Sequence, residues 1–319
     1  MIISDKQELK RCVKQAVRRA YTEECCLNFD LQDGRLGVDA LLDESGLRGR
    51  KGTPFGGDGA AFYAALDALE LPSRDLNSAR SIQLSYERNA YLREILDAMR
   101  ARRVLVSVDA GQRAVDFFGD ERFAPLVTVS GSLFAPGRYG VDYQQAARLV
   151  QESLNALDAR DLMPESFDED ALRYCLMPVC EDTGCVIHIR LTCEDEIHRF
   201  SGLLDSFPSV RALVRAPQPL EPALIACAGC RPRMLVCLTG FEHLALALSS
   251  LGTRLMAYAS CASSPDMMLG RWLCAKEQFW QALCDVYLPL ARAGYSLESS
   301  AVEQDVEMLL GGSMMNLYT

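Results

Sequence analysis

Eight short apolar runs, separated by segments with helical periodicity, constrain the fold of this chain most strongly. The clearest runs are residues 103–109 (RVLVSVD), 185–191 (CVIHIRL) and 234–238 (MLVCL). Short apolar runs alternating with amphipathic helices indicate parallel strands joined by crossover helices. The remaining predicted strands are residues 24–31, 123–130, 174–180, 210–214 and 255–260. Eight such units favour an α/β fold of the (β/α)₈, TIM-like barrel type over an open sheet.

The length of the chain leaves room for one insertion. Its 319 residues exceed the roughly 250 typical of such a barrel, without reaching a second full domain. Residues 32–100 contain no strand candidate, and helices are predicted there at 60–71 and 79–100. We therefore predict a single domain over residues 1–319 with a helical insertion over 32–100. A long helix at 267–293 and a last one, capped by Ser300 and Glu303, close the chain.

Charge and cysteine usage exclude several classes of partner. The net charge of −10 disfavours nucleic acid, although a local anion site remains open. No segment has the approximately 18 uninterrupted apolar residues of a membrane span, and the N-terminus lacks the apolar core of a secretion signal. Thirteen cysteines, many inside apolar runs, suit reduced thiols. We expect a cytoplasmic protein that binds no membrane; homo-oligomers are left open.

The stretch from residue 254 to 272, RLMAYASCASSPDMMLGRW, predicts the last strand, a polar loop and a helix. Residues 210–240, 251–272 and 287–318 together resemble the uronate isomerase branch of the amidohydrolase superfamily, and the first two predicted strands match it more loosely. The resemblance implies a distorted (β/α)₈ barrel with an early helical insertion. It also implies interconversion of aldo- and keto-sugar acids. The family's divalent metal is held by a His-x-His pair after the first strand and an aspartate after the eighth.

This chain departs from the family pattern at the metal ligands. Asn28-Phe29-Asp30 replaces the His-x-His pair, and Cys261 stands where the family places the aspartate. His188 matches a fifth-strand histidine of the family, but Arg190 follows where glycine is favoured. Amide oxygens are poor ligands for zinc-like ions. The departures predict a degenerate metal site; if a divalent metal is bound, its ligands would be Asp30, His188 and Cys261.

Each candidate near the barrel mouth also has a structural interpretation. Asn28 and Asp30 lie two positions apart, so on a strand they share one face and could both point into the barrel mouth. Alternatively, they cap the next turn by hydrogen bonding to the backbone. Asp109 matches an acidic family position that orients substrate hydroxyls, but Asp-Ala-Gly also forms turns. Arg138 and Arg190 could pair with a substrate carboxylate. For Arg190 we prefer pairing with the acidic run at 194–196.

Two classes of function follow from these residues. In the favoured one, the protein is a binding or regulatory relative without metal chemistry, and its pocket takes a small carboxylate or sugar acid through Asn28, Arg138, Arg190 and Ser260. In the other, it is an active isomerase in which Asp30 or His188 acts as base, a residual metal or Arg190 polarises the carbonyl, and Asp109 contacts substrate. A metal-dependent hydrolase is a third reading, because fold alone does not select the reaction. His198 and His243 are predicted to be surface helix residues.

Overall fold

The computed structural model describes residues 3, 5–28, 36–47, 56–112, 119–135 and 142–318. The chain divides into two compact units, each described by itself below. Unit 1 comprises Met1–Val106, Asp116–Phe123 and Ala259–Leu310, and unit 2 comprises Ser107–Val115, Ala124–Tyr258 and Gly311–Thr319. The single domain predicted over residues 1–319, with its insertion over 32–100, stays a prediction.

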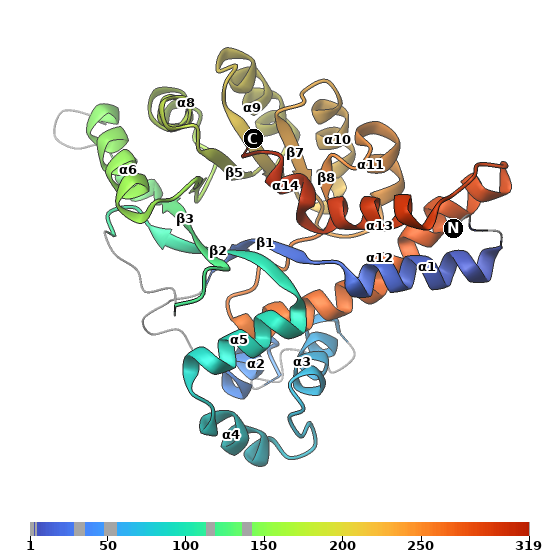
Figure 1. The fold of residues 1–319 in the computed structure, drawn as a ribbon. Coiled ribbons are helices and arrows are strands. Elements are labelled where there is room, and N and C mark those ends of the chain that lie inside the picture. The colour runs from blue at the N-terminus through green and yellow to red at the C-terminus, as the bar shows by residue number, and fades with distance from the viewer. Residues whose placement is uncertain are drawn as a thin grey trace. The chain divides into compact units, whose positions relative to one another are not determined.

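The strands follow chain order. Within the described residues one eight-stranded sheet runs from β1 to β8 (Figure 1). Its members are β1 (Thr22–Leu27), β2 (Ala101–Asp109), β3 (Phe123–Val129), β4 (Asp161–Pro164), β5 (Val186–Arg190), β6 (Arg211–Arg215), β7 (Met234–Cys237) and β8 (Leu255–Met256). Neighbouring strands are parallel in every pair whose register is described. Together with the intervening helices, this order confirms the predicted (β/α)₈-type fold class with helices inserted after the first strand.

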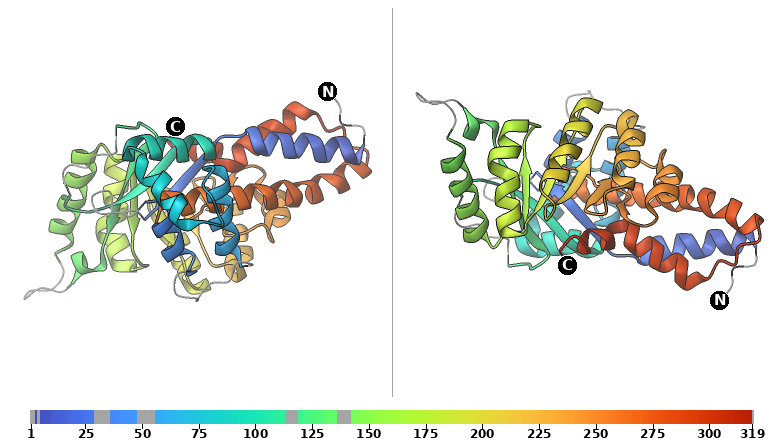
Figure 2. Two further views of the ribbon diagram at one scale, coloured as in Figure 1. Left: turned by 90° about the horizontal axis from the view of Figure 1, so that it is seen from below. Right: turned by 90° about the horizontal axis from the view of Figure 1, so that it is seen from above.

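Unit 1 is built around one long helix. Its helices are α1 (Lys6–Arg19), α2 (Val38–Glu44), α3 (Gly57–Ala68), α4 (Leu76–Ser85), α5 (Arg88–Met99), α12 (Pro265–Arg292) and α13 (Ser299–Glu307). Helix α12 packs against α1, α2, α3 and α5, and Figure 2 shows α1, α12 and α13 side by side. Trp272 and Phe279 of α12 are fully buried in this core. Gly270 lets α12 approach α3, because a Cβ there would lie 2.0 Å from the Ala61 carbonyl oxygen.

Unit 2 alternates strands with helices as the apolar pattern predicted. Its helical elements are η1 (Gly131–Phe134), α6 (Tyr143–Leu157), α7 (Glu169–Ala171), η2 (Leu172–Leu176), α8 (Met177–Thr183), α9 (Glu194–Ser206), η3 (Gln218–Leu220), α10 (Glu221–Gly229), α11 (Leu244–Leu251) and α14 (Ser313–Met315). Helix α10 packs against α9, α11 and β7. Helix α9 shows why these segments are helical: acidic residues in its first turn complement the helix dipole, and Ile197, Phe200 and Leu204 form its buried stripe.

The predicted fourth strand is wrong. Residues 174–180 lie in η2, a π-helix, and in α8, whereas the observed β4 is Asp161–Pro164. Pro178 occupies the first turn of α8, where a helix needs no N–H donor, so it starts this helix instead of interrupting a strand. Asp168 caps the preceding helical turn through its side chain. The true β4 is only four residues long and carries little periodic signal.

Three smaller expectations are corrected as well. The helix predicted at 79–100 is two helices, α4 and α5, separated by extended backbone at Tyr86 and Glu87. Strand β8 ends at Met256, so Ser260 lies in the following loop. The cap of α13 is Glu298, without a side-chain hydrogen bond, so Ser300 does not form the predicted capping box. None of the described helices is long and apolar enough to cross a membrane.

Candidate functional site

The carboxyl ends of β5, β6 and β7 carry a pair of arginines. Arg190 ends β5 and is in register with Arg215, which ends β6 and is in turn in register with Cys237 of β7. Register partners on parallel strands point to the same face, so both guanidinium groups belong to one edge of unit 2. In (β/α)₈ folds this edge forms the active-site face. Two adjacent cations there favour an anionic ligand.

Arg190 is free to bind such a ligand. Its side chain is exposed, and it forms no ion pair or side-chain hydrogen bond within the described ranges. The sequence favoured pairing of Arg190 with the acidic run 194–196, but two residues of that run have other partners. Glu196 accepts hydrogen bonds from the Thr192 amide at 2.5 Å and hydroxyl at 2.9 Å, and Asp195 pairs with Arg199 at 2.7 Å. The acidic run therefore does not neutralise Arg190.

His188 lies two residues before Arg190 on the same face of β5 and is 1% exposed. Its Nε2 lies 2.7 Å from Oδ1 of the buried Asp161, the first residue of β4. The Tyr318 hydroxyl donates to the same oxygen at 2.5 Å. Because an ionised carboxylate only accepts, Nε2 carries a proton, and Nδ1 is an acceptor in the neutral imidazole. That Nδ1 is buried and has no hydrogen-bond partner among the described atoms.

A second buried polar atom lies on this face. Thr128 of β3 is in register with Met163 of β4, and the register of β4 with β5 puts Asp161 and His188 on the same side. The Thr128 hydroxyl is buried and without a partner in the described part of the chain. Met163 Sδ lies 3.9 Å from Arg215 Nη2, which links this layer to the arginine pair. Unsatisfied buried polar groups are costly, so water or a ligand is expected to complete them.

A buried glutamate holds a second histidine at the same strand ends. Glu221, at the start of α10, is fully buried. Its Oε1 accepts from the Thr239 amide at 2.7 Å and hydroxyl at 2.8 Å, and its Oε2 lies 3.0 Å from His243 Nδ1. The His243 side chain is 25% exposed. The carboxylate orients the imidazole and leaves Nε2 able to accept or release a proton. His243, predicted to be a surface helix residue, is half-buried at the start of α11 and contacts Glu221.

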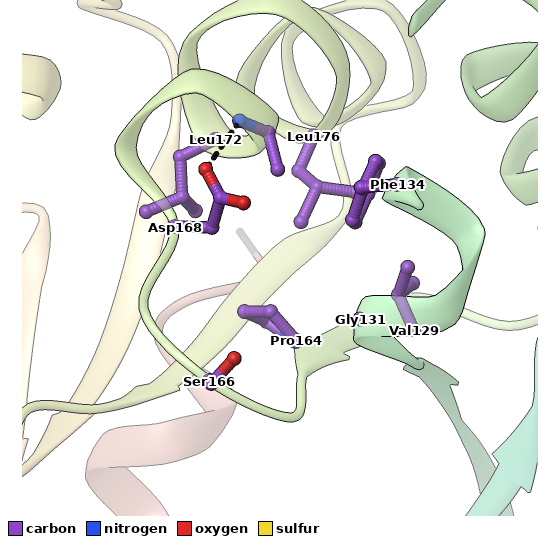
Figure 3. A pocket seen from close by; sticks show the side chains of 9 residues that line it. Val129, Gly131, Phe134, Pro164, Ser166, Asp168, Leu172 and Leu176 are labelled. Atoms are coloured by element: carbon purple, nitrogen blue, oxygen red, sulfur yellow. Dashed lines mark hydrogen bonds between the residues drawn. The ribbon is translucent and has the colours of Figure 1, made fainter. Parts of the chain in front are cut away.

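Figure 3 shows a hollow at the carboxyl ends of β3 and β4. It is open to solvent and is lined mainly by Val129, Phe134, Pro164 and Leu172. Asp168 also lines it, but its Oδ1 accepts the amides of residues 170 and 171 at 3.1 Å. An apolar lining without a cation does not suit a carboxylate, so we do not place the anion there.

Three of the predicted site residues lie together in unit 1. The Asn28 amide donates to the Ala262 carbonyl at 3.0 Å, which brings the end of β1 to the loop after β8. Asn28 and Cys261 are exposed, while Ser260 is buried. Cys261 has a φ of 49°, in the left-handed region that costs a non-glycine residue about 1 kcal/mol.

Buried Glu24 organises this loop. Its Oε1 accepts from the Cys26 amide at 3.1 Å, and its Oε2 accepts from the Ser260 amide at 2.8 Å and from Trp272 Nε1 at 2.9 Å. The Ser260 hydroxyl accepts the Ala262 amide at 3.3 Å. These bonds connect β1, the loop and α12, so they give Glu24 and Ser260 a role in shaping the loop.

The remaining predicted residues are placed as follows. Asp30 and Arg138 fall outside the described residues. Asp109 ends β2 and is exposed, and its carbonyl accepts the Gln112 amide at 3.1 Å, which is the turn weighed as its alternative. Asn28, Ser260 and Cys261 belong to unit 1, whereas Asp109, His188 and Arg190 belong to unit 2.

The described side chains offer no complete set of ligands for a divalent metal. No group of three His, Cys, Asp or Glu side chains that could hold a metal ion occurs among the described residues. His188 uses Nε2 for Asp161, and Asn28 offers only an amide. The described side chains do not fit the metal that the family resemblance implies, and no chemical step is derived through it.

The fold of this chain is similar to that of several solved structures. No protein-family model and no curated protein matches the chain. A crystal structure of a uronate isomerase from Bacillus halodurans C-125 superimposes with a TM-score of 0.85 at 15% identity, covering 99% of this chain and 97% of that one. The chain has the uronate isomerase fold.

Two further structures share this fold. A uronate isomerase from Thermotoga maritima matches with a TM-score of 0.62 at 10% identity, covering 98% of this chain and 97% of that one. A protein from Lactobacillus casei ATCC 334, assigned as a metal-dependent hydrolase, matches with a TM-score of 0.62 at 12% identity and covers 96% and 97%.

Sequence reasoning missed five residues of these clusters: Asp161, Arg215, Glu221, His243 and Tyr318. A signal existed for two of them, because Arg215 and His243 closely follow predicted strands, where a barrel places its functional side chains. Asp161 begins a strand that was not predicted, and Tyr318 lies far from its partner in sequence.

Proposed function

We propose that the protein is a divergent, uronate isomerase-like member of the amidohydrolase superfamily that binds a small carboxylate, such as a sugar acid, at the carboxyl ends of β5 and β6. The observation that carries this proposal is Arg190, which is exposed, unpaired within the described ranges and in register with Arg215. The buried thiols support a reducing, cytoplasmic setting.

The chemistry of the site matches a hydroxy acid. A guanidinium binds a carboxylate through two parallel N–H donors. His188 Nδ1 then offers an acceptor to a hydroxyl of the same ligand. Residues two apart on one strand are separated by roughly 6.6 Å, which suits a carboxylate and a hydroxyl a few carbons away. A sugar acid presents both groups in one molecule.

The proposal includes a degenerate metal site. It is supported by Asn28 and Cys261 at the family's ligand positions and by the engagement of His188 Nε2 with Asp161. Without a metal, ligand binding would depend on Arg190, Arg215 and the acceptor nitrogen Nδ1 of His188.

A second candidate is an active aldose–ketose isomerase. The Glu221–His243 pair favours it, because isomerisation needs a base that moves a proton between neighbouring carbons. In this reading His243 Nε2 transfers the proton, and Arg190 orients the substrate carboxylate. Asp30 or His188 remains the alternative base from sequence.

Calorimetric titration of the full chain tests the binding function. Glucuronate and galacturonate are compared with glucose and galactose, which lack the carboxylate. We expect binding of the acids alone and about tenfold weaker binding in Arg190→Gln, because a charge-assisted bond is lost. Arg199→Gln, which changes an exposed arginine paired on α9, is the matched control and should bind as the natural protein does. Equal binding of neutral sugars, or no binding of any acid, contradicts the proposal.

Turnover assays and elemental analysis separate the two candidates. The first candidate predicts less than one equivalent of tightly bound transition metal and little conversion of either uronate. Turnover that disappears in His243→Gln would establish the isomerase. Stoichiometric metal with turnover that disappears in Asp30→Ala would instead restore the metal-dependent mechanism of the family.

A further inference from the structure

We propose that Tyr318, near the C-terminus, is a positioning residue. Through Asp161 it holds His188 with Nε2 protonated and Nδ1 ready to accept a hydrogen bond from a ligand hydroxyl. The ligand part rests on the proposed function, whereas the orientation of His188 can be measured without any ligand.

The side chains of His188 and Tyr318 both contact one carboxylate oxygen of Asp161. Asp161 Oδ1 lies 2.7 Å from His188 Nε2 and accepts the Tyr318 hydroxyl at 2.5 Å. Asp161 is fully buried and His188 is 1% exposed, while Tyr318 is half-buried. A short relay therefore runs from the end of the chain into the interior of unit 2.

The terminal segment is tied to unit 2 before it reaches Tyr318. At the start of α14, the Ser313 hydroxyl donates to the Thr253 carbonyl at 2.5 Å. Arg211, the first residue of β6, donates to the Leu317 carbonyl. Strands β4 and β6 both begin here, so the segment lies at the amino ends of the strands, opposite Arg190 and Arg215. These anchors place the Tyr318 hydroxyl reproducibly against Asp161.

The consequence for His188 is a defined tautomer. An imidazole exchanges its single proton between two nitrogens unless a partner selects one of them. The carboxylate selects Nε2–H, and the Tyr318 hydroxyl restrains that carboxylate by occupying the same oxygen. The lone pair on Nδ1 then has no partner among the described atoms and can accept a donor. A hydroxyl-bearing acid anchored on Arg190 supplies that donor.

Nitrogen-15 NMR of the histidine side chains tests the proposal directly, because the chain contains only three histidines. His198→Gln and His243→Gln assign the signals. In the ligand-free protein at neutral pH we expect His188 to show a protonated Nε2 and an unprotonated Nδ1. In Tyr318→Phe the carboxylate is no longer held in place by the hydroxyl, so we expect the Nδ1 signal to move toward the tautomer average. Tyr295→Phe, at an exposed tyrosine, is the control and should change nothing.

Titration with glucuronate completes the test. Tyr318→Phe should weaken binding about fivefold with no large loss of thermal stability, the effect of one hydrogen bond. Asp161→Asn should shift the tautomer further, and it serves as the second variant if Tyr318→Phe fails to fold. A natural protein with Nδ1 protonated, or unchanged His188 signals in folded Tyr318→Phe, overturns the positioning role; if that variant does not fold, unchanged signals in Asp161→Asn overturn it. If the signals change as expected but no acid binds, the proposed function fails and the positioning role stands.

Discussion

Charged groups inside this protein are stabilised by partners from distant segments. Lys276 of α12 is 9% exposed, and its Nζ donates to the carbonyls of Ala20 at 3.3 Å and Met99 at 3.2 Å. These two carbonyls follow α1 and end α5, so one side chain joins the ends of two helices to a third. Burial, with the nearby charge of Arg100, lowers the pKa of Lys276 to about 8.

This pKa predicts a pH dependence of stability. Between the folded pKa near 8 and the unfolded value near 10.4, the unfolded chain holds a proton that the folded protein has released. The free energy of unfolding should therefore rise with pH in this window, by about 1–2 kcal/mol from pH 8 to pH 9.5. Urea denaturation at several pH values measures the rise.

Lys276→Met should abolish this rise, because the titrating group is gone. Lys10→Met, at an exposed lysine of α1, should keep it. If the natural protein and Lys276→Met show parallel pH profiles, Lys276 does not titrate in this range.

The buried carboxylate of Glu221 allows a second prediction about a single residue. Glu221→Gln replaces an acceptor facing His243 Nδ1 with an amide that can present a donor there. We expect the free energy of unfolding to fall by about 1–3 kcal/mol, as for hydrogen bonds to charged groups. Equilibrium urea unfolding measures it, and Glu242→Gln, at the exposed neighbouring residue, should remain within about 0.5 kcal/mol. A negligible change at Glu221 would mean that this carboxylate does not order the turn.

Among the candidate site residues, the sequence predicted His188 and Arg190. It missed Asp161 and Tyr318, which form the hydrogen-bonded group around His188. Both lie in an apolar run of clear strand character, so their alternation along one face follows from the chain alone. Asp161 and Tyr318 are 157 positions apart, and no local pattern indicates that they meet. Long-range hydrogen bonds of this kind are decided by packing.

At the scale of elements, the contact between α12 and α3 depends on one missing side chain. A Cβ at Gly270 would lie 2.0 Å from the Ala61 carbonyl oxygen, which belongs to the backbone and cannot swing aside. Gly270→Ala should therefore lower the free energy of unfolding by about 2–4 kcal/mol. Chemical denaturation of the purified variant measures the loss.

Gly202→Ala is the matched control for this substitution. Gly202 lies in α9 with nothing within 4 Å of an added Cβ, and it is exposed. Alanine there should stabilise the protein by about 0.5–1 kcal/mol, because it restricts the unfolded chain. Equal effects at both glycines would contradict the close approach of α12 to α3.

The errors in predicted elements have local causes. An apolar run containing Pro178 resembled a strand, but proline in the first turn of α8 is compatible with a helix. Strand β8 is only two residues long, and the loop after it is held by Glu24 of β1, which accepts the Ser260 amide. Short strands are selected by their neighbours in the sheet, which periodicity cannot show.

At the scale of the whole molecule, stability should not depend on a metal. The described residues hold no three-ligand cluster, so removing divalent ions breaks no cross-link among them. We expect the Tm after dialysis against a chelator to stay within about 1 °C of the untreated value. Differential scanning calorimetry measures it, with added zinc as the reverse experiment. A large fall that zinc restores would point to a structural metal.

The sequence by itself determined the architecture of this protein, because alternating short apolar runs and amphipathic helices allow few arrangements that bury both. It also placed Arg190 and His188 on one strand face. Only the tertiary structure decided which polar groups surround the site. Asp161, Tyr318, Glu221 and His243 come from separate segments, and their hydrogen bonds form when strands and connecting loops meet. The physical reason is that hydrophobic patterning is local and repeated, whereas the pairing of buried polar atoms depends on a few contacts between distant residues.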